Sequence, residues 1–304
     1  MSVVISTYQE GEALAATVRS VSHADPRPRE IVVVDDGSTD GSAERDWPDH
    51  VTLVRQAHRG IAAARNRGAR VASQPALVFL DAHCGVADGW LDPLLDLLDE
   101  EPEAVAGPAV RDAEEPDYVG CGARIVDALF TYRWQRVPDT AGALVPVGVV
   151  PGGCLAVSRR AFADAGGFAP FTGFGVEDVE ISLRWWRAGR PLLGVPASQV
   201  AHRFRATPPY RPDHASWLRN VLRTALLHLT GERLRATVLA CARFSSFNRA
   251  VADVLTERWA EAASRLAVAE VRQVVSYLDT WAPAAFPAQV SSDDAPAIDG
   301  WTAW

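Results

Sequence analysis

The sequence contains no lysine, so all 30 of its basic residues are arginine. Against them stand 38 acidic residues, which gives a formal net charge of -8. This excess of negative charge argues against a general nucleic-acid or anionic-membrane binder. The missing lysine indicates coding bias more than chemistry, although arginine is well suited to binding phosphate.

Cysteine is also scarce, and long apolar runs are absent. Cys84, Cys121, Cys154 and Cys241 lie far apart without a Cys-x-x-Cys pair, which argues against a zinc site or a disulfide framework. No apolar run is long enough to span a bilayer, and the chain opens directly with an expected strand. We therefore expect no transmembrane segment, no signal peptide and a cytoplasmic location.

The apolar pattern of the 304 residues predicts an α/β protein. Short apolar strands alternate with helical segments up to about residue 110, which is typical of a parallel sheet. We expect a catalytic domain over 1–210 and, from apolar residues at helical spacing, a helical extension over 211–282. The Pro/Ala/Asp-rich segment 283–304 is expected to be a flexible tail.

The most informative stretch is 78–84, which reads Val-Phe-Leu-Asp-Ala-His-Cys. Residues two apart on a strand point the same way, so Asp81 and His83 can converge on one cation. Open α/β sheets keep their ligands at this carboxyl edge. The alternative is an ordinary turn that Asp81 caps and in which His83 is exposed.

Three further segments carry polar groups next to predicted strands or helices. The β-branched run 31–34 ends in Asp35 and Asp36, whose carboxylates could accept hydrogen bonds from a ribose or a base. The alanine-rich helix 59–70 carries Arg65, a candidate diphosphate clamp. The simpler interpretations are turn chemistry and a solvated arginine face.

The third segment, 173–186, places Glu177, Asp178 and Glu180 in the first turn of a helix. Acidic residues at that position are partly explained by the helix dipole, and Glu177 and Glu180 share one face. A carboxylate at the helix start, after a Gly-Phe-Gly lead-in, could also act as a base.

In this order the segments resemble the GT-A glycosyltransferases, family 2 in particular. That family has a strand that runs into a polar turn, then Asp-Asp-Gly-Ser-x-Asp, Gly-x-x-x-Ala-Arg-Asn-x-Gly, a strand ending in Asp-x-Asp, and an acidic Glu-Asp helix. The chain departs from this pattern at Asp81-Ala82-His83. An Asp-x-His motif followed by Cys resembles the polypeptide N-acetylgalactosaminyltransferases, as does Gly-Trp-Leu-x-Pro-Leu-Leu at 89–95. The resemblance covers about residues 2–206.

The resemblance implies a metal-dependent hexosyl- or N-acetylhexosaminyltransferase with a GT-A fold, that is, a mainly parallel sheet flanked by helices. It adds His202 to Asp81 and His83 as metal ligands, and two imidazoles favour Mn²⁺ over Mg²⁺. It implies Asp178 as the base beside Glu177. The donor, expected to be a UDP-sugar, would contact the following residues: Thr7, Tyr8, Glu10, Asp36, Arg65, Asp81 and Gly153.

Several alternatives remain open at this point. The N-acetylgalactosaminyltransferases retain configuration and carry Glu-Asn where this chain has Glu177-Asp178, so retention stands against the inversion that we favour. A sugar nucleotidyltransferase and a dinucleotide oxidoreductase would each need a glycine-rich loop that the segment 6–12 lacks. A non-catalytic nucleotide-sugar binding protein is also open. The acceptor could be a small molecule, a lipid-linked intermediate or a peptide, and the aromatic segment 111–150 could face it.

Overall fold

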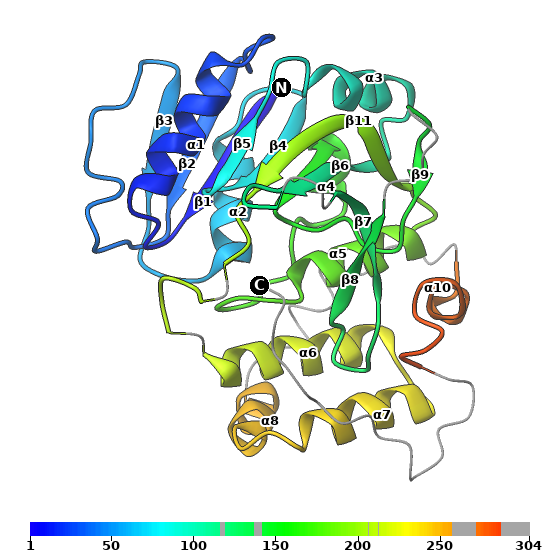
Figure 1. Ribbon diagram of the computed structural model, residues 1–304. Helices are drawn as coiled ribbons and strands as arrows, with labels where there is room; N and C mark the ends of the chain where they lie inside the picture. Colours follow the sequence, from blue (N-terminus) through cyan, green and yellow to red (C-terminus); the bar gives the residue numbers. More distant parts are fainter. Residues whose placement is uncertain (116–118, 137–141, 206, 212, 257–271, 287–304) are drawn as a thin grey trace.

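The computed structural model describes residues 1–115, 119–136, 142–205, 207–211, 213–256 and 272–286. Within these residues the centre of the molecule is an eleven-stranded mixed sheet in the order β3-β2-β1-β4-β10-β6-β11-β5, with β7, β8 and β9 beside it (Figure 1). The strands are β1 (Ser2–Thr7), β2 (Glu30–Asp35), β3 (Val51–Arg55), β4 (Ala76–Asp81), β5 (Cys84–Val86), β6 (Val105–Asp112), β7 (Val119–Ile125), β8 (Tyr132–Arg136), β9 (Val145–Pro146), β10 (Cys154–Ser158) and β11 (Leu192–His202). The helices are α1 (Glu12–His23), α2 (Ile61–Val71), α3 (Asp92–Glu100), α4 (Arg159–Asp164), α5 (Glu177–Arg187), α6 (His214–His228), α7 (Gly231–Cys241), α8 (Phe247–Thr256) and α10 (Val274–Trp281).

The first half of the sheet is parallel, and its strands β1, β2 and β4 are buried almost throughout, as is typical of parallel sheets covered on both faces. Strands β3, β2, β1 and β4 run in one direction, joined by helical or loop crossovers. Strand β10 then runs antiparallel between β4 and β6. The predicted α/β fold with helices on a largely parallel sheet is confirmed, and the antiparallel strands in its second half refine it.

Alternation along β1 divides the apolar residues between two cores. Val3 and Ile5 face α1 and α3, which bury Leu14 and Leu94 against them. Val4 faces the other side, in the larger core that also contains residues of α5, α6 and α10. The four cysteines are buried, and their thiols are free.

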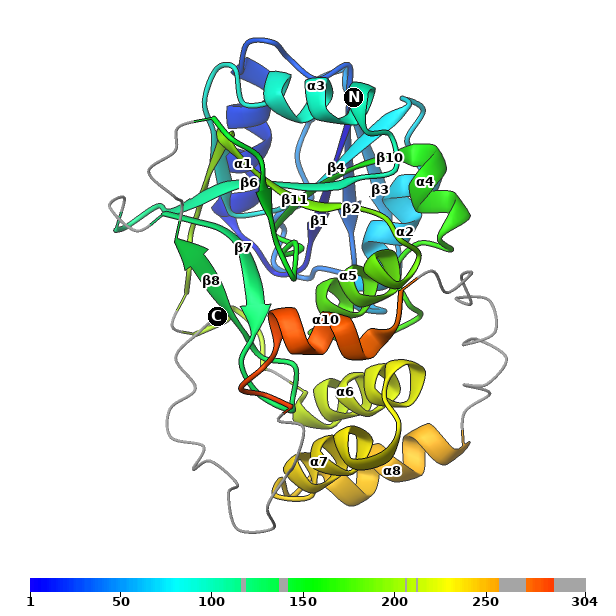
Figure 2. The ribbon, with the colours of Figure 1, turned by 90° about the vertical axis from the view of Figure 1, so that its right-hand side faces the viewer.

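The C-terminal helices pack onto the larger core, the one that contains Val4. In Figures 1 and 2 α6, α7 and α8 lie together on one side of the sheet, and α10 packs against α5. On α6 Ala225 is buried and its neighbour Leu226 is 51% exposed. Ala285 and Phe286 of the expected tail are buried, and residues 287–304 lie outside the described residues. Among the described residues no helix combines the length and the hydrophobicity that a membrane span requires.

A buried charge network ties α5 to α6. Glu180 is fully buried and accepts two hydrogen bonds from Arg184, at 2.8 Å each. His228 of α6 lies 3.2 Å from the same carboxylate. Burial raises the pKa of Glu180, but Arg184 and His228 outweigh it and hold the pKa at about 2. Of the acids in the first turn of α5, Glu180 is therefore structural.

Replacement of Glu180 by alanine is expected to lower the free energy of unfolding by about 3–5 kcal/mol, because it leaves the buried Arg184 without its counter-charge. Urea denaturation measures the loss. The matched control is the double variant Glu180→Leu/Arg184→Met, which removes both charges and keeps the volume. It should be markedly more stable than Glu180→Ala, and equal losses would contradict this account.

Candidate active site

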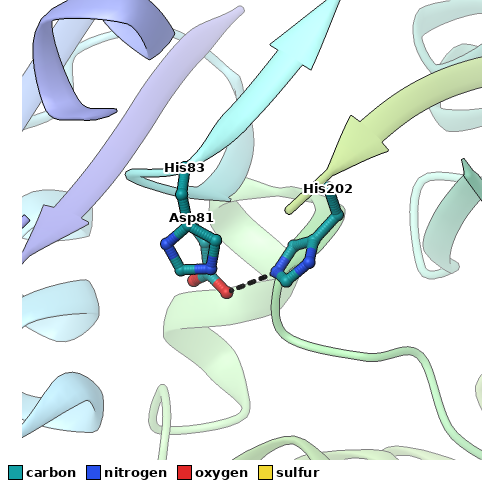
Figure 3. Close-up of side chains that lie close together, drawn as sticks. All are labelled: Asp81, His83 and His202. Carbon is teal, nitrogen blue, oxygen red and sulfur yellow. Dashed lines mark ion pairs between the residues drawn. The ribbon is translucent and has the colours of Figure 1, made fainter. Parts of the chain in front are cut away.

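Three potential metal ligands meet where two strands end. Asp81 is the last residue of β4, His83 follows in the turn to β5, and His202 ends β11. Strand β5 pairs antiparallel with β11, with Cys84 opposite His202, and this register brings the distant histidine to the turn. One ligand atom of each residue lies within 4.8 Å of the others (Figure 3).

The two imidazoles flank the carboxylate. His202 Nε2 lies 3.5 Å from Asp81 Oδ2, and the rings of His83 and His202 are 4.6 Å apart at 74°. His83 Nδ1 lies 3.2 Å from Glu10 Oε1, while Arg205 donates to Glu10 Oε2 at 2.6 Å. A proton on Nδ1 directed at Glu10 leaves the Nε2 lone pair of His83 for a cation, an arrangement common around metal-binding histidines.

These residues fit a divalent metal ion. Burial raises the pKa of Asp81, but the hydrogen bond from His202 and the charges of Arg65 and His83 outweigh burial. They hold the pKa of this carboxyl far below its usual range, so the side chain is ionised. Within the described chain His202 Nδ1 is buried without a partner. A Cβ at Gly153 would lie only 3.1 Å from Asp81 Oδ2, so the absence of a side chain keeps the approach to the cluster open. One carboxylate and two imidazoles suit Mn²⁺ better than Mg²⁺.

Arg65 joins the metal-ligand cluster to the acidic helix. Its Nη2 donates to Asp81 Oδ1 and its Nη1 to Glu177 Oε1, both at 2.9 Å. The guanidinium is buried. It therefore holds Asp81 and Glu177 at a fixed separation. Each terminal nitrogen carries a second N–H, so the expected contact of Arg65 with a diphosphate stays a prediction.

Close backbone packing brings α2 and α5 together. A Cβ at Gly60, just before α2, would come within 2.3 Å of the carbonyl oxygen of Gly173, so only glycine permits this approach. The amide of Ile61 donates to the same carbonyl. Val176, the residue before α5, has a left-handed φ of 73°, an uncommon conformation for a β-branched residue that is often found near functional sites.

Asp178 is buried and accepts three hydrogen bonds. Tyr132 Oη donates to its Oδ2 at 3.0 Å and the amide of Gly152 to the same oxygen at 3.1 Å. The amide of Val179 donates to Oδ1 at 2.8 Å. Burial raises the pKa of Asp178, and burial together with the neighbouring charge of Asp178 raises the pKa of Glu177 to about 7. The two carboxyls are neighbours whose charges oppose each other, so they lose their protons as a pair and not independently.

The two consecutive glycines before β10 connect both halves of the site. The amide of Gly152 binds Asp178, whereas Gly153 lies against Asp81 and His202. A Cβ at Gly152 would also come within 2.4 Å of Arg65 Nη1. The acidic pair and the metal-ligand cluster thus border one glycine turn.

The predicted donor residues at the ends of β1 and β2 lie near the same edge. Asp36 is buried and accepts from Gln56, Arg59 and Gly60, and lies 2.9 Å from His58 Nδ1. Its carboxylate thus anchors the loop before α2. The buried hydroxyl of Thr7 has no partner among the described residues.

His58 and Tyr210, which the sequence did not indicate, lie against the predicted donor residue Tyr8. The ring of His58 stacks on that of Tyr8 with centroids 4.0 Å apart, and the ring centroid of Tyr210 lies 5.5 Å from that of Tyr8. No sequence signal distinguishes them from ordinary loop aromatics, because only the fold brings the segments together.

The aromatic segment before β9 divides between packing and the site. Phe130 is a core residue, Trp134 lies 6.0 Å from Phe204, and Tyr132 reaches Asp178. Part of this segment is therefore packed, and Tyr132 belongs to the site; whether the segment faces the acceptor stays a prediction.

Comparisons with known proteins agree with this geometry. A family model described as glycosyl transferase family 2 matches residues 2–165. Polypeptide N-acetylgalactosaminyltransferase 4 of Caenorhabditis elegans is 32% identical over 229 residues, which are 69% of this chain and 39% of the relative. The chain spans about two fifths of the length of such curated relatives.

Two solved structures share the fold. GalNAc-T7 with UDP, GalNAc and Mn²⁺ superposes with a TM-score of 0.67 and 24% identity, over 86% of this chain and 55% of that chain. A mannosyltransferase from Pyrobaculum calidifontis in complex with GDP-Man and Mn²⁺ superposes with a TM-score of 0.51 and 20% identity, over 94% and 75%. At these identities the likeness establishes a common architecture.

Proposed function

The chain belongs to glycosyl transferase family 2, and on this premise we propose that it transfers a sugar from a nucleotide diphosphate donor to an acceptor. One observation carries the proposal. Asp81, His83 and His202 form one cluster, and Asp81 and His202 lie against Gly153. Asp178 of the Glu177–Asp178 pair accepts a hydrogen bond from the amide of the adjacent Gly152. A site for a divalent cation and a candidate base thus share one sheet edge.

We propose that Asp81, His83 and His202 hold a Mn²⁺ ion, with Mg²⁺ as a poorer substitute. Bound there, the cation would act as a Lewis acid for the negative charge that develops on a departing diphosphate. The protein's own part is to keep the ligands in place. Glu10 orients His83, and Arg65 fixes Asp81 relative to Glu177.

Asp178 is our proposed base, and the proposed outcome is inversion at the anomeric carbon. A carboxylate oxygen can accept about two hydrogen bonds. Oδ2 already has two donors, whereas Oδ1 receives one within the described structure. The proton of an acceptor hydroxyl would therefore go to Oδ1.

A uridine nucleotide is the proposed donor. Two features support this choice: the resemblance to the N-acetylgalactosaminyltransferases and the polar, aromatic ends of the first two strands. Tyr8, stacked on His58, offers a flat surface beside Thr7 and Asp36. Stacking on such a surface, together with polar strand ends, suits a nucleoside.

The test is a hydrolysis screen in Mn²⁺ with UDP-, GDP- and dTDP-sugars, with water as the acceptor. We expect release of UDP from at least one UDP-sugar. Titration calorimetry with UDP and GDP in Mn²⁺ should give tighter UDP binding. Tighter GDP binding would refute the uridine assignment alone, and no release or binding with any nucleotide would refute the proposed function.

A further inference from the structure

Tyr132 is the only side chain that hydrogen-bonds Asp178 within the described structure. It comes from β8, in a hairpin far in sequence from α5, and its hydroxyl lies 3.0 Å from Asp178 Oδ2. The other two donors are backbone amides, of Gly152 and Val179. A backbone amide cannot be removed by an ordinary substitution, whereas a side-chain donor can. Among these three hydrogen bonds to the proposed base, the one from Tyr132 is therefore the one that a substitution can remove.

We propose that Tyr132 is a positioning residue, which pins Oδ2 of Asp178 through its hydroxyl and so presents Oδ1, ionised, to the acceptor. This inference rests on the proposed function. Oδ2 holds the carboxylate in place through its hydrogen bonds, and Oδ1 accepts the proton. Tyr132 is half-buried on the β7–β8 hairpin, and its Oη donates to Asp178. The residue therefore links the hairpin to the proposed base.

The charged and titratable groups that face Asp178 come from several elements. Arg65 on α2 favours the ionised form, whereas Glu177 on α5 opposes it. Tyr277 on α10 is buried nearby, but its hydroxyl donates to the carbonyl of Gly148. Donation from the Tyr132 hydroxyl favours the carboxylate and lowers the pKa of Asp178, against the larger effect of burial.

Tyr132→Phe removes this donor and keeps the ring. The pH at which Asp178 loses its proton should rise by roughly one to two units, as for a lost hydrogen bond to a charged group. Donor hydrolysis would then lose activity at a higher pH on its acidic side, while KM for the UDP-sugar identified in the screen stays within about twofold. The matched control is Tyr277→Phe, which removes another buried phenolic hydroxyl and should leave the pH profile unchanged.

A second readout does not depend on turnover. Titration of ¹³C-labelled aspartate carboxyls by NMR, with Asp178→Asn for assignment, follows the same proton in wild type, Tyr132→Phe and Tyr277→Phe. A rise confined to Tyr132→Phe supports the inference. Equal titration in wild type and Tyr132→Phe, or an equal rise in Tyr277→Phe, overturns it. If the wild type hydrolyses no donor, the proposed function fails, and the NMR result still decides the contact.

Discussion

Asp81→Ala is expected to lower donor hydrolysis by two or more orders of magnitude. The cost would correspond to the several kcal/mol that a Lewis-acid cation contributes to a departing diphosphate. Asp81 is the only carboxylate of the proposed ligand set. Its loss also removes one of the two carboxylates that pair with the buried guanidinium of Arg65, so the positive charge beside the site is less compensated. EDTA should abolish activity, and Mn²⁺ should restore it best.

Two controls separate metal binding from folding. Asp96→Ala, at an exposed position of α3, should keep full activity and Mn²⁺ affinity. In Asp81→Asn, which keeps the shape of the side chain, Mn²⁺ binding measured by electron paramagnetic resonance should weaken at least tenfold, as for loss of a ligand. Full activity in EDTA, or unchanged Mn²⁺ affinity in Asp81→Asn, would remove these residues from the proposed metal site.

The fold was readable because several strands are short apolar runs that end abruptly in polar residues. The run before Asp81 predicts a strand buried on both faces, and β4 is buried from Ala76 to Leu80. Spacing alone placed His83 next to Asp81. His202 came from the family resemblance, since only the pairing of β5 with β11 brings it close.

Other parts of the site depend on packing that no local pattern reports. An arginine in an alanine-rich helix is usually solvated, yet Arg65 is buried, because Gly60 and Gly173 allow α2 to approach α5. The contact of Tyr132 with Asp178 depends on the register of a hairpin. The domain boundaries, the cytoplasmic location and the acceptor stay predictions.

Asp178→Asn should retain UDP affinity within about threefold and lose on the order of 100-fold or more in kcat, the usual effect of a lost general base. Asparagine keeps the shape of the side chain but cannot accept the acceptor's proton. In the wild type we expect kcat/KM to rise with pH on its acidic side, with an inflection above the usual pKa of an aspartate. The reason is that burial raises the pKa of Asp178 and the base must be ionised. Asp164→Asn, at an exposed position of α4, is the matched control and should show the wild-type profile.

The stereochemistry of the product distinguishes the two mechanisms that share this fold. Proton NMR of the released sugar, recorded before mutarotation, should show an inverted anomeric centre if a base activates the nucleophile on the opposite face. Asp178 can serve as that base, because its carboxylate is bound by the amide of Gly152, next to the Gly153 that lies against Asp81 and His202. A product with the donor's configuration would instead align this chain with a retaining mechanism. In that case Asp178 and Tyr132 would together orient the acceptor, and Asp178→Asn should raise KM for the acceptor more than it lowers kcat.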